Sequence, residues 1–196
     1  MKIVGLTGGI GSGKTTVANL FATYNNVAIY IADVEAKKLM HTSFVIKNKL
    51  IQEFGEKAYS NNQLNRAYIS SIVFKDKSKL EILNKIVHPE VRKHFQNFVK
   101  SQINKDFIIY EAAILFESKS NLLCDFIITV YVDLETKLER IISRDNSSRT
   151  EVLNRMKNQL SDTPKLLQSN YIIYNKNLDQ TKLQIEKIHK ILTEKA

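Results

Sequence analysis

Short apolar runs alternate along this chain with longer segments whose apolar residues recur at helical spacing. The runs have the length and continuity of strands that are buried on both faces of a sheet. They are Ile3–Leu6, Val27–Ile31, Phe107–Phe116 (interrupted by Tyr110 and Glu111), Phe126–Val132 and Tyr171–Tyr174. Alternation of such strands with helices predicts an α/β fold, a mostly parallel sheet with helices on both faces.

Residues 34–102 depart from this alternation, because no strand pattern is convincing from 34 to 101. The helices expected there are Phe44–Phe54, ended by Gly55; Asn65–Phe74; one opened by the capping box of Ser78 and Glu81; and one that starts at Pro89. The His88-Pro89 step is expected to break the third of these helices, because proline interrupts helical hydrogen bonding. The pattern therefore predicts a helical insertion between the second and third strands.

Charge gathers in a later helical segment, which opens at Asp133-Leu134-Glu135. Its basic residues are Lys137, Arg140, Arg144, Arg149, Arg155 and Lys157, interleaved with Glu135, Glu139, Asp145 and Glu151. Each residue alone is explained by i,i+4 pairing on a solvated helical hairpin. As a group, in a chain that also has a phosphate-binding loop, they predict a helical lid over residues 137–167. The remaining core is expected to be 1–33, 103–136 and 168–196, closed by an amphipathic helix over Leu183–Leu192, all in a single domain.

One stretch concentrates the chain's backbone freedom, since five of its six glycines fall between Gly5 and Gly13. Residues Gly8 to Thr15 fit the P-loop pattern G-x-x-x-x-G-K-[ST], with an apolar run before and a helical pattern over Thr16–Tyr24 after. Glycines let backbone N–H groups converge on phosphate oxygens, and the helix start adds unpaired N–H groups and its dipole. The stretch therefore predicts a site for the phosphates of ATP.

Each residue type in this loop suits a task in phosphate binding. The predicted ATP contacts are Gly8, Gly9, Ile10, Gly11, Ser12, Gly13, Lys14, Thr15 and Thr16. The Lys14 ammonium is expected to bridge the β- and γ-phosphates, and the Thr15 hydroxyl to hold Mg²⁺. Asp33 follows the second strand at the sheet edge that carries ligands in open α/β folds. It also suits the N-cap of a helix over Val34–Met40, and the two roles can coexist.

Composition narrows the class of ligand. The formal net charge is +9, from 29 basic and 20 acidic residues, and the basic residues are dispersed. Dispersed positive charge fits small polyanionic substrates better than a nucleic-acid or membrane surface. The single cysteine, Cys124, excludes an internal disulfide and a cysteine-built metal cluster, and is expected to be a small core residue. With no signal-peptide or membrane-spanning pattern, we expect a cytoplasmic protein.

Other P-loop classes fit less well. A GTPase would carry Asn-Lys-x-Asp, whereas the nearest string here, starting at Asn175, ends in Leu178. A dinucleotide-binding fingerprint needs a third glycine where this chain has Lys14. A kinase with an acceptor-binding insertion and an Arg-rich lid remains. A kinase for another nucleoside or nucleotide stays open, as does a nucleic-acid-binding NTPase, which would show steep salt dependence and stimulation by nucleic acid.

Over nearly its full length the chain resembles the dephospho-coenzyme A kinase family. The matching residues are Leu6 to Lys14, Ala32-Asp33, His88-Pro89, Ile114 to Glu117, Arg140, Arg144-Asp145, Gln159 and Asn175. Two positions depart from the family pattern. Ile31 stands where the family usually has a first aspartate, and Ala113 replaces a proline. The resemblance therefore leaves the carboxylate chemistry after the second strand to Asp33.

The resemblance implies ATP-dependent phosphorylation of the ribose 3′-hydroxyl of dephospho-CoA, which gives coenzyme A and ADP. The catalytic residues it implies are Asp33, Lys14 and Arg140, with Arg144 and Asn175 on the nucleotide and His88 and Glu117 on the acceptor. His88 is equally suited to a helix cap, and Asn175 to a turn. The insertion, residues 34–102, would bind the acceptor. Expected partners are ATP and dephospho-CoA, with no nucleic acid or membrane, in a monomer or small homo-oligomer.

Overall fold

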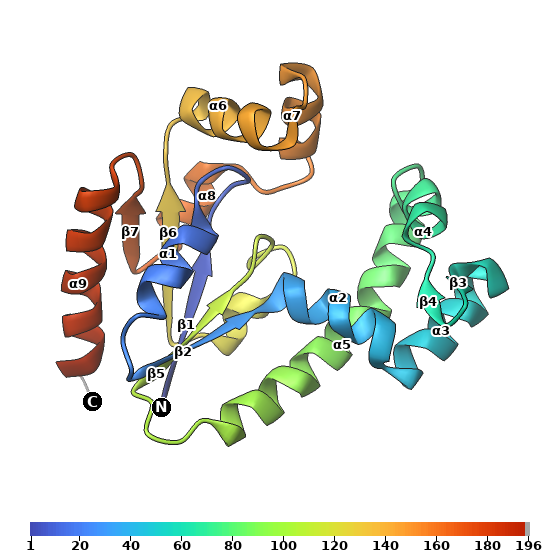
Figure 1. Ribbon diagram of the computed structural model, residues 1–196, viewed down its shortest axis with the longest axis horizontal. Helices are drawn as coiled ribbons and strands as arrows, with labels where there is room; N and C mark the ends of the chain where they lie inside the picture. Colours follow the sequence, from blue (N-terminus) through green and yellow to red (C-terminus); the bar gives the residue numbers. More distant parts are fainter. Residues whose placement is uncertain (195–196) are drawn as a thin grey trace. The chain divides into compact units, whose positions relative to one another are not determined.

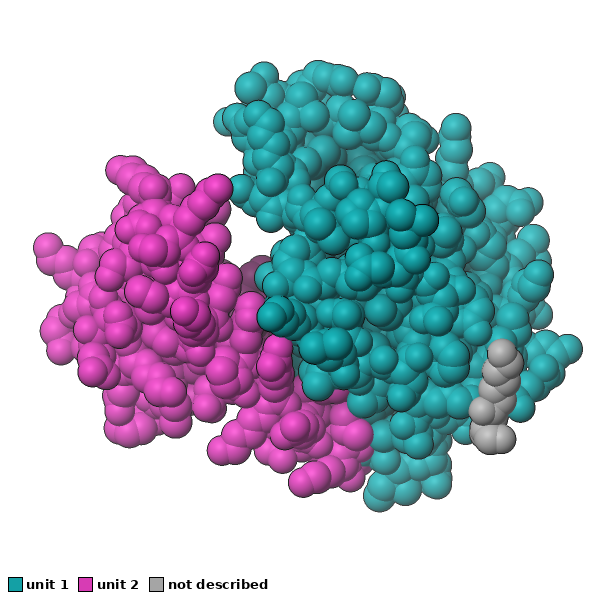
Figure 2. Space-filling view, turned by 180° about the vertical axis from the view of Figure 1, so that it is seen from behind, with its two compact units in different colours: residues 1–31, 102–196 teal, residues 32–101 magenta. Residues whose placement is uncertain are grey.

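The computed structural model describes residues 1–194 and forms two compact units, coloured separately in Figure 2. Unit 1 comprises Met1–Ile31 and the described residues from Gln102 onward, and unit 2 is Ala32–Ser101. Unit 1 contains the main sheet, and unit 2 is predominantly helical (Figure 1). Each unit has its own buried apolar residues and is described separately below.

The main sheet of the described residues is five-stranded and parallel, in the order β2-β5-β1-β6-β7. Its strands are β1 (Lys2–Thr7), β2 (Val27–Ile31), β5 (Phe107–Glu111), β6 (Phe126–Tyr131) and β7 (Tyr171–Tyr174). Every predicted strand is present, so the expected fold class is confirmed. The third is shorter than its apolar run because the chain leaves the sheet at Ala112, and Leu115 is buried outside the strand.

Two helices cover one face of this sheet. They are α1 (Lys14–Phe21) and α9 (Leu178–Glu194). Alternate strand residues such as Val4, Leu6 and Ile128 form one buried cluster with Phe21 of α1 and Ile185 of α9. Because side chains alternate between the faces of a strand, these positions fix which face the two helices cover. The closing helix is longer than the predicted Leu183–Leu192.

The residues between these positions point to the opposite face. A Cβ on Gly5 would lie 2.8 Å from Leu115 Cδ2 and 2.9 Å from Cys124 Sγ, so the segment after β5 packs directly on the β1 backbone. Cys124 is partly buried there, not fully buried as expected for a core residue, and this burial raises the pKa of its thiol to about 12. Thr129 of β6 shares a 2.6 Å hydrogen bond with Ser169, just after α8 (Asp162–Leu167).

Two further helices of unit 1 form a small hairpin, α6 (Leu134–Asp145) and α7 (Arg149–Met156). Asp133 caps α6 by accepting the Thr136 N–H, and Ser148 opens α7 in a capping box with Glu151. Their contact is a cluster of Leu138, Ile141 and Val152. The charged segment therefore also has an apolar inner face.

Unit 2 is built from helices around an apolar centre. Its elements are α2 (Ala32–Thr42), α3 (Phe44–Phe54), η1 (Glu56–Ala58), β3 (Tyr59–Ser60), β4 (Gln63–Leu64), α4 (Arg66–Val73) and α5 (Lys77–Ser101). Ser43 caps α3 and Asn65 caps α4 through their side-chain oxygens. Ile46, Leu50 and Phe95 are among the fully or almost fully buried side chains. No helix among residues 1–194 is long and apolar enough to cross a bilayer.

Unit 2 differs from the sequence expectation in two elements. A two-stranded hairpin, β3 with β4, lies where we expected no strand; its turn is Asn61-Asn62, both with positive φ, 50° and 62°. Helix α5 runs through Pro89 without the predicted break. It also begins one residue before Ser78, whose N–H donates to Asp76 Oδ1 at 2.8 Å, so Asp76 replaces the predicted capping box.

Candidate functional site

The predicted P-loop connects β1 to α1 within unit 1 (Figure 1). Its position follows from the strand order, because β1 has β5 on one side and β6 on the other. The chain runs from β1 to β2 on one side of the sheet and from the neighbouring β5 to β6 on the other. Ligands of open α/β sheets bind at such a switch point, beyond the carboxyl ends of the strands. The loop therefore lies where the sheet topology favours a ligand.

Two glycines of the loop are required by their surroundings. At Gly13 the backbone is left-handed, with φ 89°, and a Cβ would lie 2.1 Å from Asn175 Nδ2. At Gly8 a Cβ would lie 2.3 Å from the Val130 carbonyl oxygen. Gly13 also precedes α1 without a side-chain cap, so the first N–H groups of α1 are left for a ligand.

The Lys14 ammonium folds back over the loop. Its Nζ donates to the Gly8 carbonyl at 2.9 Å and to the Gly9 carbonyl at 3.4 Å. These bonds hold the charge within the concave turn that a phosphate chain would follow. Thr15 and Thr16 are exposed in the first turn of α1, and Ser12 is buried with its Oγ lacking a hydrogen-bond partner in the described chain.

Arg140 and Asn175 lie against the end of the loop. Asn175 is buried; its Nδ2 donates to the Ser12 carbonyl at 2.8 Å, and its Oδ1 accepts from the Thr181 hydroxyl at 3.0 Å. Arg140 Nη2 donates to the Asn175 carbonyl at 2.8 Å. The amide of Asn175 is therefore occupied in supporting the loop, and its contact with the nucleotide stays a prediction.

Arg144 lies in a different charged group. Its guanidinium donates to both carboxylate oxygens of Asp145, at 2.7 and 3.1 Å, and Arg155 donates to the same carboxylate at 2.7 Å. These hydrogen bonds hold the pKa of the Asp145 carboxyl well below its usual range. The Arg144 side chain is 62% exposed. The structure thus brings Arg140, and not Arg144, to the loop.

Sequence reasoning missed the contacts that join the loop to the segment after α7. The Ile10 N–H donates to Gln159 Oε1 at 2.9 Å. Lys137 of α6 forms a hydrogen-bonded ion pair with Asp162. Gln159 entered the sequence analysis only through the family resemblance, and Asp162 not at all. No local pattern connects them to a loop about 150 residues earlier in the chain.

Glu117 anchors the same segment. Its Oε1 accepts the Leu160 N–H at 2.7 Å and lies 3.5 Å from Nζ of Lys165, whose side chain is fully buried. Gly9, Ile10, Lys137, Gln159 and Asp162 line one cavity of about 500 Å³ with residues of α7. The predicted acceptor residue Glu117 therefore supports one wall of a cavity beside the loop, and its contact with the acceptor stays a prediction.

The remaining predicted residues, Asp33 and His88, belong to unit 2. Asp33 is exposed and is the second residue of α2, so the N-cap role we considered for it is wrong. His88 is half-buried within α5. Burial lowers the pKa of His88, as does the Arg92 charge, whereas the Asp33 charge raises it. Asp33 and His88 thus interact electrostatically within unit 2, and His88 caps no helix because α5 continues past it.

The side chains around the loop also show whether the site could hold Mg²⁺. Among residues 1–194, no three or more His, Cys, Asp and Glu side chains are arranged to hold a metal ion. Mg²⁺ does not need such a group, because it keeps several waters and binds through few protein oxygens plus substrate phosphates. The exposed Thr15 hydroxyl at the start of α1 is an oxygen ligand of this kind. The residues present therefore fit Mg²⁺ carried with ATP.

Comparison with known proteins identifies the family. The family model for dephospho-CoA kinase matches residues 2–180. A dephospho-CoA kinase of Bacteroides fragilis is 36% identical over 172 residues, 88% of this chain and 83% of the relative. A Thermus thermophilus crystal structure matches with TM-score 0.84 and 26% identity, covering 100% of this chain and 98% of the other. A dephospho-CoA kinase from Campylobacter jejuni shares the fold, with TM-score 0.71, 24% identity and 98% of each chain covered. This chain belongs to the dephospho-CoA kinase family.

Proposed function

We propose that this chain transfers the γ-phosphoryl group of ATP to the ribose 3′-hydroxyl of dephospho-CoA, giving coenzyme A and ADP. The observation that carries the proposal is the loop at the switch point of the sheet, with Lys14 folded over the Gly8 and Gly9 carbonyls, in a chain of this family. Such a reaction is catalysed mainly by positioning and charge neutralisation, which these groups can supply.

On the nucleotide side, the loop N–H groups and the first turn of α1 bind the phosphate chain. Lys14 and Arg140 neutralise charge on the transferred group, with Arg140 held toward the loop by its bond to the Asn175 carbonyl at 2.8 Å. Arg144 and Asn175 are the further residues that we assign to the nucleotide. Magnesium, bound with ATP, would neutralise phosphate charge, and Thr15 is the residue that would hold it.

On the acceptor side, Asp33 accepts the proton of the 3′-hydroxyl. The 3′-oxygen attacks the γ-phosphorus, and ADP leaves. His88 lies near Asp33 in unit 2, and Arg92 adds positive charge beside it. We assign acceptor binding to the insertion, residues 34–102, with His88 and Glu117 in contact, and a lid role to residues 137–167. The core is then 1–33, 103–136 and 168–196. We propose a cytoplasmic monomer or small homo-oligomer that binds neither nucleic acid nor membrane.

A substrate panel tests the reaction. ADP release is followed with Mg·ATP and, in separate reactions, dephospho-CoA, nucleosides, nucleotides or DNA. We expect turnover with dephospho-CoA alone. Phosphorylation of another nucleoside or nucleotide in preference to dephospho-CoA, or stimulation by DNA, would replace the proposal with one of the two alternatives.

The variant Lys14→Ala tests the role of the loop lysine in this reaction. It removes the ammonium from the loop and should lower kcat by about 100-fold or more, as for loss of a preorganised donor in an active site. Its melting temperature should stay near that of the wild type, because Lys14 is only partly buried and water can replace its bonds to the Gly8 and Gly9 carbonyls. An unchanged kcat in a folded variant would contradict the assignment of Lys14.

A further inference from the structure

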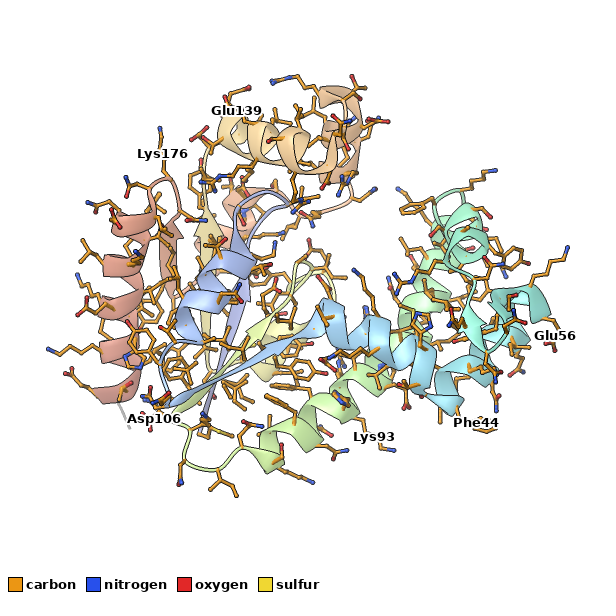
Figure 3. All side chains as sticks on the ribbon, in the orientation of Figure 1. Phe44, Glu56, Lys93, Asp106, Glu139 and Lys176 are labelled. Carbon is orange, nitrogen blue, oxygen red and sulfur yellow. The ribbon has the colours of Figure 1, made fainter. Side chains whose placement is uncertain are left out.

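Lys137 lies beside the P-loop but has no role in the reaction proposed above. Its side chain is 5% exposed, although it belongs to the charged face expected of a lid. Glu139, two residues further along α6 and labelled in Figure 3, is exposed. Lysine is rarely buried without a reason in packing or binding, because its charge loses hydration. The position of this ammonium therefore needs an explanation.

The Lys137 ammonium abuts the loop at Gly9. A Cβ built on Gly9 would lie 3.2 Å from Lys137 Nζ and 3.2 Å from Asp162 Oδ1. Lys14 donates to the Gly9 carbonyl as well. Two ammonium groups, one from α1 and one from α6, thus lie beside the same residue of the loop, Gly9.

The ammonium keeps hydrogen-bonding capacity. Of its three N–H donors, one is used by Asp162, the hydrogen-bond partner that the described residues provide for Nζ. The Nζ atom also lies 5.4 Å from the centre of the Tyr131 ring. Lys137 lines the cavity of about 500 Å³ beside Gly9 and Ile10, so Nζ can meet a ligand there.

Asp162, the counter-ion of Lys137, is less deeply buried than the ammonium it binds. The Asp162 side chain is 32% exposed and begins α8, whereas Lys137 is buried. A buried ammonium without a partner would be strongly unfavourable, so the ion pair with Asp162 offsets the lost hydration of Lys137 and holds its Nζ beside Gly9. An anionic ligand in the cavity would meet a cation that is already desolvated and oriented, the condition under which an ion contact is strongest.

We propose that Lys137 is a second phosphate-binding cation of the site, donating a hydrogen bond to a phosphate oxygen beside Gly9, and that Asp162 is its positioning residue. The phosphate belongs either to the transferred group of ATP or to the diphosphate bridge of dephospho-CoA. This proposal rests on the proposed function. The competing explanation is a structural ion pair that ties α6 to α8.

Four variants separate these explanations: Lys137→Gln, Lys137→Arg, Asp162→Asn and the double variant Lys137→Gln/Asp162→Asn. For each, kcat, the KM for ATP, the KM for dephospho-CoA and the melting temperature are measured. We expect Lys137→Gln to lose about 10- to 100-fold in kcat/KM, below the full range for a lost donor because Lys14 remains. Lys137→Arg keeps the charge and should retain more activity than Lys137→Gln.

The double variant is decisive. It removes both charges, so a structural pair would regain activity together with stability, whereas a phosphate-binding Lys137 would leave the double variant as slow as Lys137→Gln. Wild-type kinetics in Lys137→Gln, or recovered kinetics in the double variant, would overturn the proposal. If Lys137→Gln does not fold, Lys137→Met takes its place because it keeps the length of the side chain.

The kinetic constants identify the phosphate. A raised KM for ATP assigns Lys137 to the nucleotide, a raised KM for dephospho-CoA assigns it to the acceptor diphosphate, and a lowered kcat alone assigns it to the transferred group.

Lys182→Gln is the matched control, since the Lys182–Asp179 pair is exposed, 54% and 86%, and lies on α9. Titration with ATP alone keeps the test separate from the proposed function, because it needs no acceptor. If the wild type does not turn over dephospho-CoA, the proposed function is wrong. If Lys137→Gln has unchanged ATP affinity and unchanged kinetics with the acceptor, the phosphate-binding role of Lys137 is wrong.

Discussion

At the scale of single residues, Asp33 separates catalysis from local structure. Asp33→Asn keeps the shape of the side chain but removes its charge and its capacity to accept a proton. Because Asp33 is exposed and is not a helix cap, the variant should be about as stable as the wild type. We expect kcat to fall by about 100-fold or more, the range for loss of a general base, with unchanged ATP affinity.

The matched control is Glu35→Gln, which removes another carboxylate from the first turn of α2. Glu35 is bonded to Lys38 at 2.7 Å, so this variant tests the loss of acidic charge near the helix start without touching Asp33. The two variants should melt alike and differ only in kcat. Full activity of Asp33→Asn would leave the chain without an identified acceptor-side acid, because Ile31 occupies the place of the other one.

The residues that could be predicted from sequence are those whose task is local. The glycines, Lys14 and Thr15 act within one turn of chain, so their spacing reveals the loop. The residues that support the loop could not be found this way. Asn175, Gln159 and Asp162 reach it through hydrogen bonds or packing across about 150 residues of sequence, and such contacts follow only from the folded arrangement.

At the scale of elements, the continuity of α5 through Pro89, where a break was predicted, has a physical consequence. Proline in a helix interior removes one N–H donor and crowds the preceding turn, at a cost of about 3 kcal/mol relative to alanine. Pro89 is exposed in the middle of α5, so its ring gains little from packing. We therefore expect Pro89→Ala to raise the free energy of unfolding by up to about 3 kcal/mol.

Thermal and urea denaturation followed by circular dichroism measure this change. Lys93→Ala, at the exposed α5 position labelled in Figure 3, is the control and should change stability by less than about 0.5 kcal/mol. A loss of stability in Pro89→Ala would mean that the proline is accommodated better than the helix geometry suggests.

Element types were predictable where the hydrophobic pattern was clear, as in the continuous apolar runs of the five strands and the helical spacing of Phe44–Phe54. They failed where a local rule had a tertiary competitor. His88-Pro89 reads as a helix break, yet Ile86, Val87 and Val91 are buried around it and hold the helix in one piece. The β3–β4 hairpin has two residues per strand, and its signal was the Asn61-Asn62 turn, which tolerates positive φ.

At the scale of the whole molecule, each unit carries a histidine that is disfavoured as a cation. In unit 1, His189 stacks on Tyr24 with ring centres 3.8 Å apart, and its Nε2 is 2.9 Å from Asn26 Oδ1. Burial lowers the pKa of His189, although Asp106 opposes the shift. In unit 2, burial and Arg92 lower the pKa of His88. In both units, folding therefore favours the neutral form of the imidazole.

This arrangement predicts that stability rises with pH. An unfolded histidine binds a proton near pH 6.5, whereas His88 and His189 take it up only at lower pH in the folded chain. Below about pH 6.5 the unfolded chain thus binds more protons, and the free energy of unfolding falls as pH falls through that value until the folded histidines are protonated too. Urea denaturation followed by circular dichroism, at several pH values between about 7.5 and 5.5, measures the slope. His88→Asn and His189→Asn should each remove part of it, and the double variant should remove more than either. A slope that is absent in the wild type, or that the double variant keeps in full, would contradict the assignment of this pH dependence to the two histidines.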